Sequence, residues 1–225
     1  MDENKGRHEL KHNINYSDYL QICSRLSTIA SKDKNTVVEG GYRVRSLYFD
    51  NFNDKALLEK INGVNEREKF RLRLYNDNPS FIRLEKKSKK DNICYKKSTF
   101  ISLDECQKLL EGKIEVLKEN GDLLMLELYT KMLYENLKPK NIVDYKRNAY
   151  VYPVGNVRIT MDYDIRTSFD VKSFLNPKII TVPLKKGIIL EVKYDEFLPE
   201  IIRGMVLLSS RQNTAFSKYA VTRII

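Results

Sequence analysis

The chain has 225 residues, 42% of them hydrophobic, which is enough to build a core, and we expect one domain over residues 1–225. Forty Lys and Arg against 30 Asp and Glu leave a formal net charge of +10, which favours a polyanionic partner such as nucleic acid, a phosphorylated metabolite or an anionic membrane. Three scattered cysteines without C-x-x-C spacing argue against both a disulfide framework and a structural zinc site.

The N-terminal segment is charged where a signal peptide would carry an apolar core. No apolar run elsewhere approaches the length of a membrane span. We therefore expect a soluble, cytoplasmic protein.

The first patterned stretch, RHELKHN, contains the H-E-x-x-H motif of zinc proteases, which requires a helix and a third metal ligand. His8 and His12 are the only histidines, and the flanking residues alternate as in a strand. The strand interpretation puts Arg7, Glu9 and Lys11 on one face and both histidines on the outer face, partly exposed. We favour the strand.

Alternating segments rich in Val, Ile, Tyr, Phe or Arg and bounded by turn residues predict further strands along the chain. The eight predicted strands are 6–14, 41–49, 64–75, 80–88, 93–101, 140–152, 156–166 and 187–195. Helical periodicity predicts four helices at 17–32, 102–112, 121–136 and 198–210. Ser17 is the expected N-cap of the first helix, and Ser102 with Glu105 forms a capping box at the second.

Six of these strands carry a charged face opposite an apolar face. A single charged face is ordinarily solvated surface. Here six strands have one, and the amphipathic helices need the apolar faces of the strands to cover. The charged faces are therefore expected to point together, away from the helices. An antiparallel sheet of about eight strands can close into a barrel wide enough for side chains or one slender ligand. We therefore predict an α+β fold, an antiparallel eight-stranded β-barrel with helices packed outside and a cationic tunnel inside.

At this point the segments RHELKHNI, YRVRSLYFDN, EKFRLRLY, FIRLEKKSK, CYKKS, DYKRNAY, VRITMDYDI, ILEVKYD and FSKY, taken together, resemble a known family. They are similar, in the same order, to the polyphosphate polymerase domain of the vacuolar transporter chaperone (VTC) family. That family is a branch of the triphosphate tunnel metalloenzyme (CYTH-like) superfamily. The resemblance implies the triphosphate tunnel fold and transfer of the terminal phosphoryl group of ATP to a growing polyphosphate chain, with Mn²⁺ or Mg²⁺ as cofactor.

The resemblance also implies the site residues. The phosphate-binding set is Lys11, Arg71, Arg73, Lys87, Lys97, Arg147, Arg158, Lys193, Ser217 and Lys218. Within it we expect the catalytic residues to be Arg71, Arg73, Arg147, Arg158 and Lys218. Glu191 is the expected metal ligand and Glu9 a further candidate, while Glu85 and Asp162 would either be second ligands or fix neighbouring Arg and Lys side chains.

One departure separates this chain from the superfamily's hydrolases, whose first strand reads E-x-E-x-K. Here Arg7 replaces the first acid, which favours the polymerase branch. The alternatives are a triphosphatase of the same fold, a non-catalytic polyphosphate-binding module, and a single-stranded RNA binder that uses aromatic stacking. We expect ATP and inorganic polyphosphate as partners, disfavour nucleic acid, and note that a membrane-protein partner would have to be supplied in trans. No glycine-rich phosphate loop is present.

Overall fold

The computed structural model describes residues 6–33, 36, 41–184, 187–206 and 216–223. All eight predicted strands form. They are β1 (His8–Ile14), β3 (Tyr42–Asp50), β4 (Arg67–Tyr75), β5 (Ile82–Lys90), β6 (Ile93–Ile101), β7 (Lys138–Tyr152), β8 (Val157–Ser168) and β10 (Ile188–Tyr194). The two-residue strands β2 (Ser31–Lys32) and β9 (Val182–Pro183) add to β7 and β8.

The helices are α1 (Tyr16–Leu26), α2 (Lys55–Ile61), α3 (Leu103–Leu110), α4 (Val116–Glu119), α5 (Leu123–Tyr134), α6 (Glu200–Val206) and α7 (Lys218–Arg223), with the 3-10 turns η1 (Val154–Asn156) and η2 (Val171–Leu175). The predicted helices correspond to α1, α3, α5 and α6, although residues 207–210 of the last lie outside the described residues. None of the helices in the described ranges is both long enough and apolar enough to cross a membrane.

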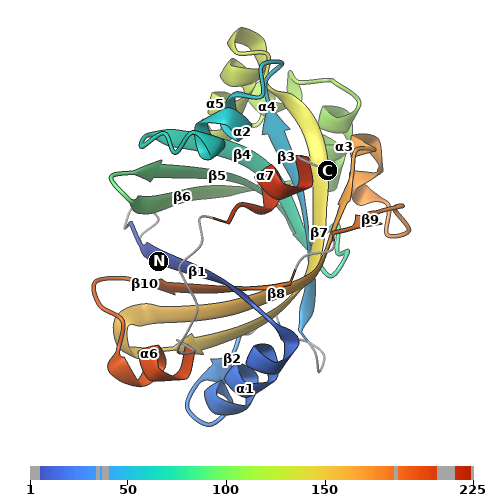
Figure 1. Cartoon of the computed structure of the whole chain (residues 1–225). Helices are drawn as coiled ribbons and strands as arrows, with labels where there is room; N and C mark the ends of the chain where they lie inside the picture. Colours follow the sequence, from blue (N-terminus) through green and yellow to red (C-terminus); the bar gives the residue numbers. More distant parts are fainter. Residues whose placement is uncertain (1–5, 34–35, 37–40, 185–186, 207–215, 224–225) are drawn as a thin grey trace.

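The sheet is antiparallel, in the order β1-β10-β8-β7-β3-β4-β5-β6, and it curls so that its two edge strands approach each other (Figure 1). The edges meet at one bridge: the Arg7 backbone N–H donates to the Cys94 carbonyl at 3.1 Å, and the Cys94 N–H donates back at 3.2 Å. The Arg7 guanidinium also binds Asp195 at 2.9 Å. The eight-stranded curled architecture predicted from the sequence is thus confirmed.

Register on the β5–β6 side is fixed by a two-residue turn. Asp91 and Asn92 both have positive φ, 47° and 64°, as a tight hairpin of right-handed twist requires. The turn sets Lys87 opposite Lys96. Because side chains alternate along a strand, Lys96 faces the concave side and Lys97 faces away from it.

Apolar clusters cover the convex face of the sheet on two sides. One joins α3, α4 and α5 to β3, β4, β5 and β7, with Leu72, Leu84 and Met125 fully buried. The other joins α1 and α6 to β8 and β10 around Ile22, Met161 and other buried residues. These helices pack outside, as predicted, because the apolar face of each strand is the face that they cover.

The histidines of β1 belong to this outer face, and the strand interpretation of the H-E-x-x-H stretch is confirmed. His8 stacks on Tyr194 with 5.3 Å between ring centroids. His12 is only 5% exposed, so the expectation that it would be partly exposed is wrong. It lies between Leu10 and Ile14 on a face that the second apolar cluster covers.

The short helices α2 and α7, which periodicity did not predict, differ from the outer helices because they pack at the cavity, on the concave face. The Tyr219 ring of α7 lies 5.1 Å from that of Tyr48, and both belong to a cluster built on β3 and β7. The buried Asp50 carboxylate holds α7 by accepting from the Tyr219 hydroxyl at 2.6 Å. The same carboxylate accepts from the backbone N–H of Ala56 and Leu57 in α2. Asp50 therefore fixes both helices beside the tunnel.

The N-terminus of α1 corrects the predicted cap. Asn15, not Ser17, is the N-cap, and it exchanges hydrogen bonds with Asp18 in a capping box. We expect Asn15→Ala to lower the free energy of unfolding by about 1 kcal/mol. Ser17→Ala is the matched control and should have almost no effect, because its hydroxyl is exposed and meets only Gln21. Urea denaturation measures both, and equal losses would contradict the assignment.

Candidate functional site

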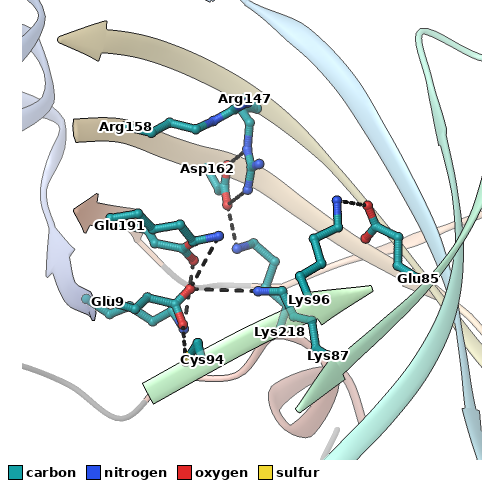
Figure 2. A network of polar contacts seen from close by, with 12 residues as sticks. Glu9, Glu85, Lys87, Cys94, Lys96, Arg147, Arg158, Asp162, Glu191 and Lys218 are labelled. Carbon is teal, nitrogen blue, oxygen red and sulfur yellow. Dashed lines mark hydrogen bonds and ion pairs between the residues drawn. The ribbon is translucent and has the colours of Figure 1, made fainter. Parts of the chain in front are cut away.

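Charged side chains from the strands converge inside the curled sheet, around a cavity of about 390 Å³ (Figure 2). Eleven basic residues line the cavity, contributed by β1, α2, β4, β5, β7, β10 and the start of α7. They are Lys11, Lys60, Arg67, Lys69, Arg71, Arg73, Lys87, Lys89, Arg147, Lys193 and Lys218. Among the described residues, three carboxylates line the cavity with them, those of Glu9, Glu68 and Glu191, so this lining carries a large excess of positive charge.

The β4 arginines are held by a buried carboxylate. Glu85 is fully buried and accepts from Arg71 through Nε at 2.7 Å and Nη2 at 2.5 Å. Lys96 reaches the same carboxylate at 2.8 Å. Burial alone would raise the pKa of Glu85, but the surrounding cations hold it well below its usual range. Glu85 therefore remains ionised and orients guanidinium groups toward the cavity without lining it.

A second buried carboxylate organises β7, β8 and α7. Arg147 binds Asp162 through two parallel bonds of 2.7 and 2.8 Å. Lys218 approaches the same carboxylate at 2.5 Å and lies over the Tyr145 ring at 4.8 Å. The Tyr145 hydroxyl accepts from Arg73 at 3.1 Å. This arrangement joins cations from three elements that are far apart in the chain.

The carboxylates of Glu9 and Glu191 form a third group with the lysines of β1, β5 and β10. Lys11 lies 3.1 Å from Glu9 and 3.8 Å from Glu191. Lys193 lies 2.9 Å from Glu191, and Lys87 lies 3.8 Å from Glu9. Burial and the second carboxylate act to raise the pKa of Glu9, but the three lysines lower it to about 2. The pKa of Glu191 is also well below its usual range, so both groups are anionic at neutral pH.

This pair fits a hard divalent cation that also binds phosphate. Mg²⁺ in phosphate-transfer sites typically takes one or two protein carboxylates and completes its shell with phosphate oxygens and water. The Oε1 atom of Glu9 is buried and accepts no hydrogen bond from the part of the chain that is described. Within that part there is no group of three or more His, Cys, Asp or Glu that could hold a metal. Of the three carboxylates that line the cavity, Glu68 pairs with Lys86 and Lys131, so Glu9 and Glu191 are the donor pair that the described residues offer.

The sequence model of the VTC domain family matches residues 6–224. The chain belongs to the VTC domain family. No curated protein matches it.

Solved structures are similar to this VTC domain in fold. One is titled "putative adenylate cyclase" and comes from Bacillus halodurans: it is 12% identical, the match covers 85% of this chain and 81% of that chain, and the TM-score is 0.50. A protein of Pyrococcus horikoshii is 12% identical, with 96% and 97% covered and a TM-score of 0.49. At 12% identity, the similarity to the Bacillus halodurans structure shows only a shared fold, the triphosphate tunnel fold.

The VTC domain brings most of the predicted phosphate-binding residues to the cavity, including Ser217, but two lie elsewhere. Arg158 binds Asp33 at 2.9 Å and the Tyr42 hydroxyl at 3.0 Å, and its side chain is 33% exposed outside the cavity lining. Lys97 is exposed on the far face of β6. Its neighbour Lys96 occupies the inward position.

Several residues of the site were missed from the sequence. Lys69 lines the cavity from β4, and the hairpin register turns Lys96 inward; neither is among the predicted site residues. Tyr48 and Tyr145 also line the cavity, although a tyrosine in a strand gives no signal in the sequence that separates a site residue from a core residue. The Tyr48 hydroxyl accepts from Arg71 at 3.1 Å. Burial would raise the pKa of Tyr48, but the adjacent cations lower it to about 8.

Proposed function

We propose that this VTC domain is a polyphosphate polymerase that transfers the terminal phosphoryl group of ATP to a growing polyphosphate chain. The observation that carries the proposal is the convergence of eleven basic side chains from seven elements on one cavity. Such an excess of fixed positive charge suits a ligand with one negative charge on each repeating unit. Recognition through side chains on phosphate oxygens fits a chain without a glycine-rich phosphate loop.

In this reaction the protein must position the reacting groups in line and neutralise the charge on the phosphate oxygens. A terminal oxygen of the acceptor chain attacks the γ-phosphorus, the bond from that phosphorus to the bridging oxygen breaks, and ADP leaves. The planar guanidinium groups of Arg71, Arg73 and Arg147 can each donate two hydrogen bonds to phosphate oxygens that become more negative during transfer. The buried carboxylates of Glu85 and Asp162 hold these guanidinium groups in place. Lys11, Lys87, Lys193 and Lys218 act as point charges along the chain.

Glu191 and Glu9 would hold the divalent cation, Mn²⁺ or Mg²⁺, through their oxygen atoms. When bound, that ion supplies charge neutralisation on phosphate oxygens. We assign Glu85 and Asp162 to the positioning of Arg71 and Arg147, since each is enclosed by cations. Arg158 lies outside the cavity lining and pairs with Asp33, so we assign it no part in the transfer.

Synthesis is favoured over hydrolysis by the first strand. The position where the superfamily's hydrolases carry their first acid is Arg7, whose side chain binds Asp195 and the Asn156 carbonyl at the closure of the sheet. It offers no carboxylate to the cavity. One ligand of a hydrolase-type metal site is therefore lost.

Incubation of the purified protein with ATP and Mn²⁺, followed by gel separation and a polyphosphate stain, tests the proposal. We expect long chains and ADP, and no product from an Arg147→Gln variant, because the loss of one guanidinium group at the reacting phosphate costs about 100-fold or more. Orthophosphate as the sole product would indicate a triphosphatase. Polyphosphate binding without turnover would indicate a binding module.

A competition experiment separates the proposal from RNA binding. Unlabelled tripolyphosphate should displace a labelled polyphosphate chain, whereas an oligonucleotide without a 5′ triphosphate should compete only weakly. Displacement by both alike would favour a general nucleic-acid groove.

A further inference from the structure

The cations of the cavity fall into two groups that differ in their carboxylate partners. In the centre, Arg71 and Arg73 pair with Glu85, Arg147 and Lys218 with Asp162, and Lys11, Lys87 and Lys193 with Glu9 or Glu191. These pairs offset the cost of partly burying each charge. Carboxylates therefore offset much of the positive charge of the centre before any ligand binds, although Lys193 lowers the pKa of Lys87 well below its usual range.

The second group lies toward α2 and has no such compensation. Lys60, Arg67, Lys69 and Lys89 line the cavity, and none of them has a carboxylate within ion-pair distance among the described residues. The Arg67 guanidinium donates to the Val64 carbonyl. The Lys69 ammonium lies 5.8 Å from the Tyr48 ring centroid. We call these four residues the cationic mouth.

Three residues of the cationic mouth lie at the border between two cavities, and the fourth, Lys60, lines only the first. A second cavity, of about 400 Å³, is lined by parts of α2, β4, β5 and α5. It shares Arg67, Lys69 and Lys89 with the first. Its remaining lysines are paired: Lys55 with Glu135 at 3.0 Å, Lys90 with Glu66 at 3.0 Å, and Lys131 with Glu68 at 2.5 Å. Uncompensated charge is therefore concentrated where the two cavities meet.

Two of the four residues are destabilised as cations by their surroundings. Burial and then Arg67, Lys11 and Lys89 lower the pKa of Lys60. Burial is the main cause that lowers the pKa of Lys69 to about 8; Tyr48 opposes it, and Lys11 and Arg71 lower the pKa further. An anion seated among these groups would favour their charged forms.

The direction of β4 links the mouth to the centre. Arg67, Lys69, Arg71 and Arg73 follow one another on one face of the strand at intervals of about 7 Å. A chain held at Arg73 and Arg71 therefore meets Lys69 and Arg67 next.

We propose that the cationic mouth is a distal subsite that binds phosphate units of a long inorganic polyphosphate chain whose reacting end lies among the paired cations of the centre. This deepens the proposed function and rests on it for the identity of the ligand. The mouth contributes affinity only to chains long enough to reach it. Tripolyphosphate, which fills the centre alone, gains nothing from it.

The test compares two ligands on one variant. Lys60→Gln/Lys89→Gln removes two uncompensated charges at partly exposed positions and does not alter the residues that form the ion pairs of the centre. We expect its dissociation constant for long-chain polyphosphate to rise about tenfold and the salt dependence of that binding to become shallower, since fewer counterions are released. The dissociation constant for tripolyphosphate should change by less than about twofold.

A matched control removes two charges elsewhere. Lys113→Gln/Lys118→Gln neutralises exposed lysines near α4 and should leave both dissociation constants unchanged. Arg67→Gln is a second mouth variant that should repeat the length-dependent loss. Equal weakening for both ligands, or no weakening for the long chain, would overturn the subsite.

The same measurements distinguish this proposal from the proposed function. Wild-type protein that binds long chains more tightly than tripolyphosphate, loses that preference in the mouth variants, and yet makes no polymer would support the subsite and refute the polymerase. Wild-type protein with no preference for long chains would overturn the subsite even if it makes polymer.

Discussion

Glu191→Gln should lower turnover of ATP by at least about 100-fold, because the substitution removes one of two carboxylates that we assign to the divalent cation. Polyphosphate binding should stay the same or tighten. Glu191 lies 2.9 Å from Lys193 and 3.8 Å from Lys11, so its neutralisation leaves both ammonium groups free to bind phosphate. Steady-state assays with Mn²⁺ and a metal-free polyphosphate binding assay measure the two effects separately.

The control for this variant is Glu119→Gln, which makes the same change at an exposed position in α4 and should leave both readouts unaltered. Glu9→Gln should resemble Glu191→Gln, since the two carboxylates share Lys11. Retention of full turnover by Glu191→Gln would show that the metal ligands lie elsewhere. Loss of polyphosphate binding along with turnover would show that the residue supports the shape of the tunnel.

The sequence was most informative where strands alternate regularly. In KFRLRLY the period of two separates Lys69, Arg71 and Arg73 from Phe70 and the leucines, and the structure keeps that separation, with cations inside and apolar residues under α5. The alternation alone therefore identified the charged face of β4. It could not say which other strands share that face, because convergence depends on how the sheet closes.

Alternation failed where the backbone departs from regular geometry. Regular alternation would place Asp164 on the same face as Asp162, but Asp164 has a φ of 50° and pairs with Lys146 and Arg166 outside the cavity. The β7–β8 register also shifts between Asp144 and Lys146. Lys97 shows a related limit, since only the two-residue turn before β6 decides which of two adjacent lysines faces inward.

Helix α7 could not be predicted from hydrophobic periodicity. It has six residues, too few for helical periodicity to show, and it is held by the tertiary contact between Tyr219 and Asp50. Ser217 and Lys218 therefore entered the candidate site only through the resemblance to the family. The buried carboxylates Glu85 and Asp162 lie on charged strand faces that alternation identifies, but the sequence could not show their partners, which lie on other strands.

Asp162→Asn should lower the free energy of unfolding by about 3 kcal/mol, because it leaves two buried cations without their shared counter-charge. Asp162 is fully buried and binds both Arg147 and Lys218. The lost attraction is replaced by repulsion between a guanidinium and an ammonium in a site of low dielectric. Urea denaturation of the ligand-free variant and of the wild type measures the difference.

Two further measurements show whether the loss arises from charge. Asp162→Asn/Lys218→Met keeps the length of the side chain on α7 but removes one of the repelling cations, so it should recover part of the lost stability. Polyphosphate should raise the melting temperature of Asp162→Asn by more than that of the wild type, because a bound anion supplies the missing counter-charge. If neither the second substitution nor the ligand restores stability, Asp162 acts through packing, and the cationic interior does not depend on anions for its balance.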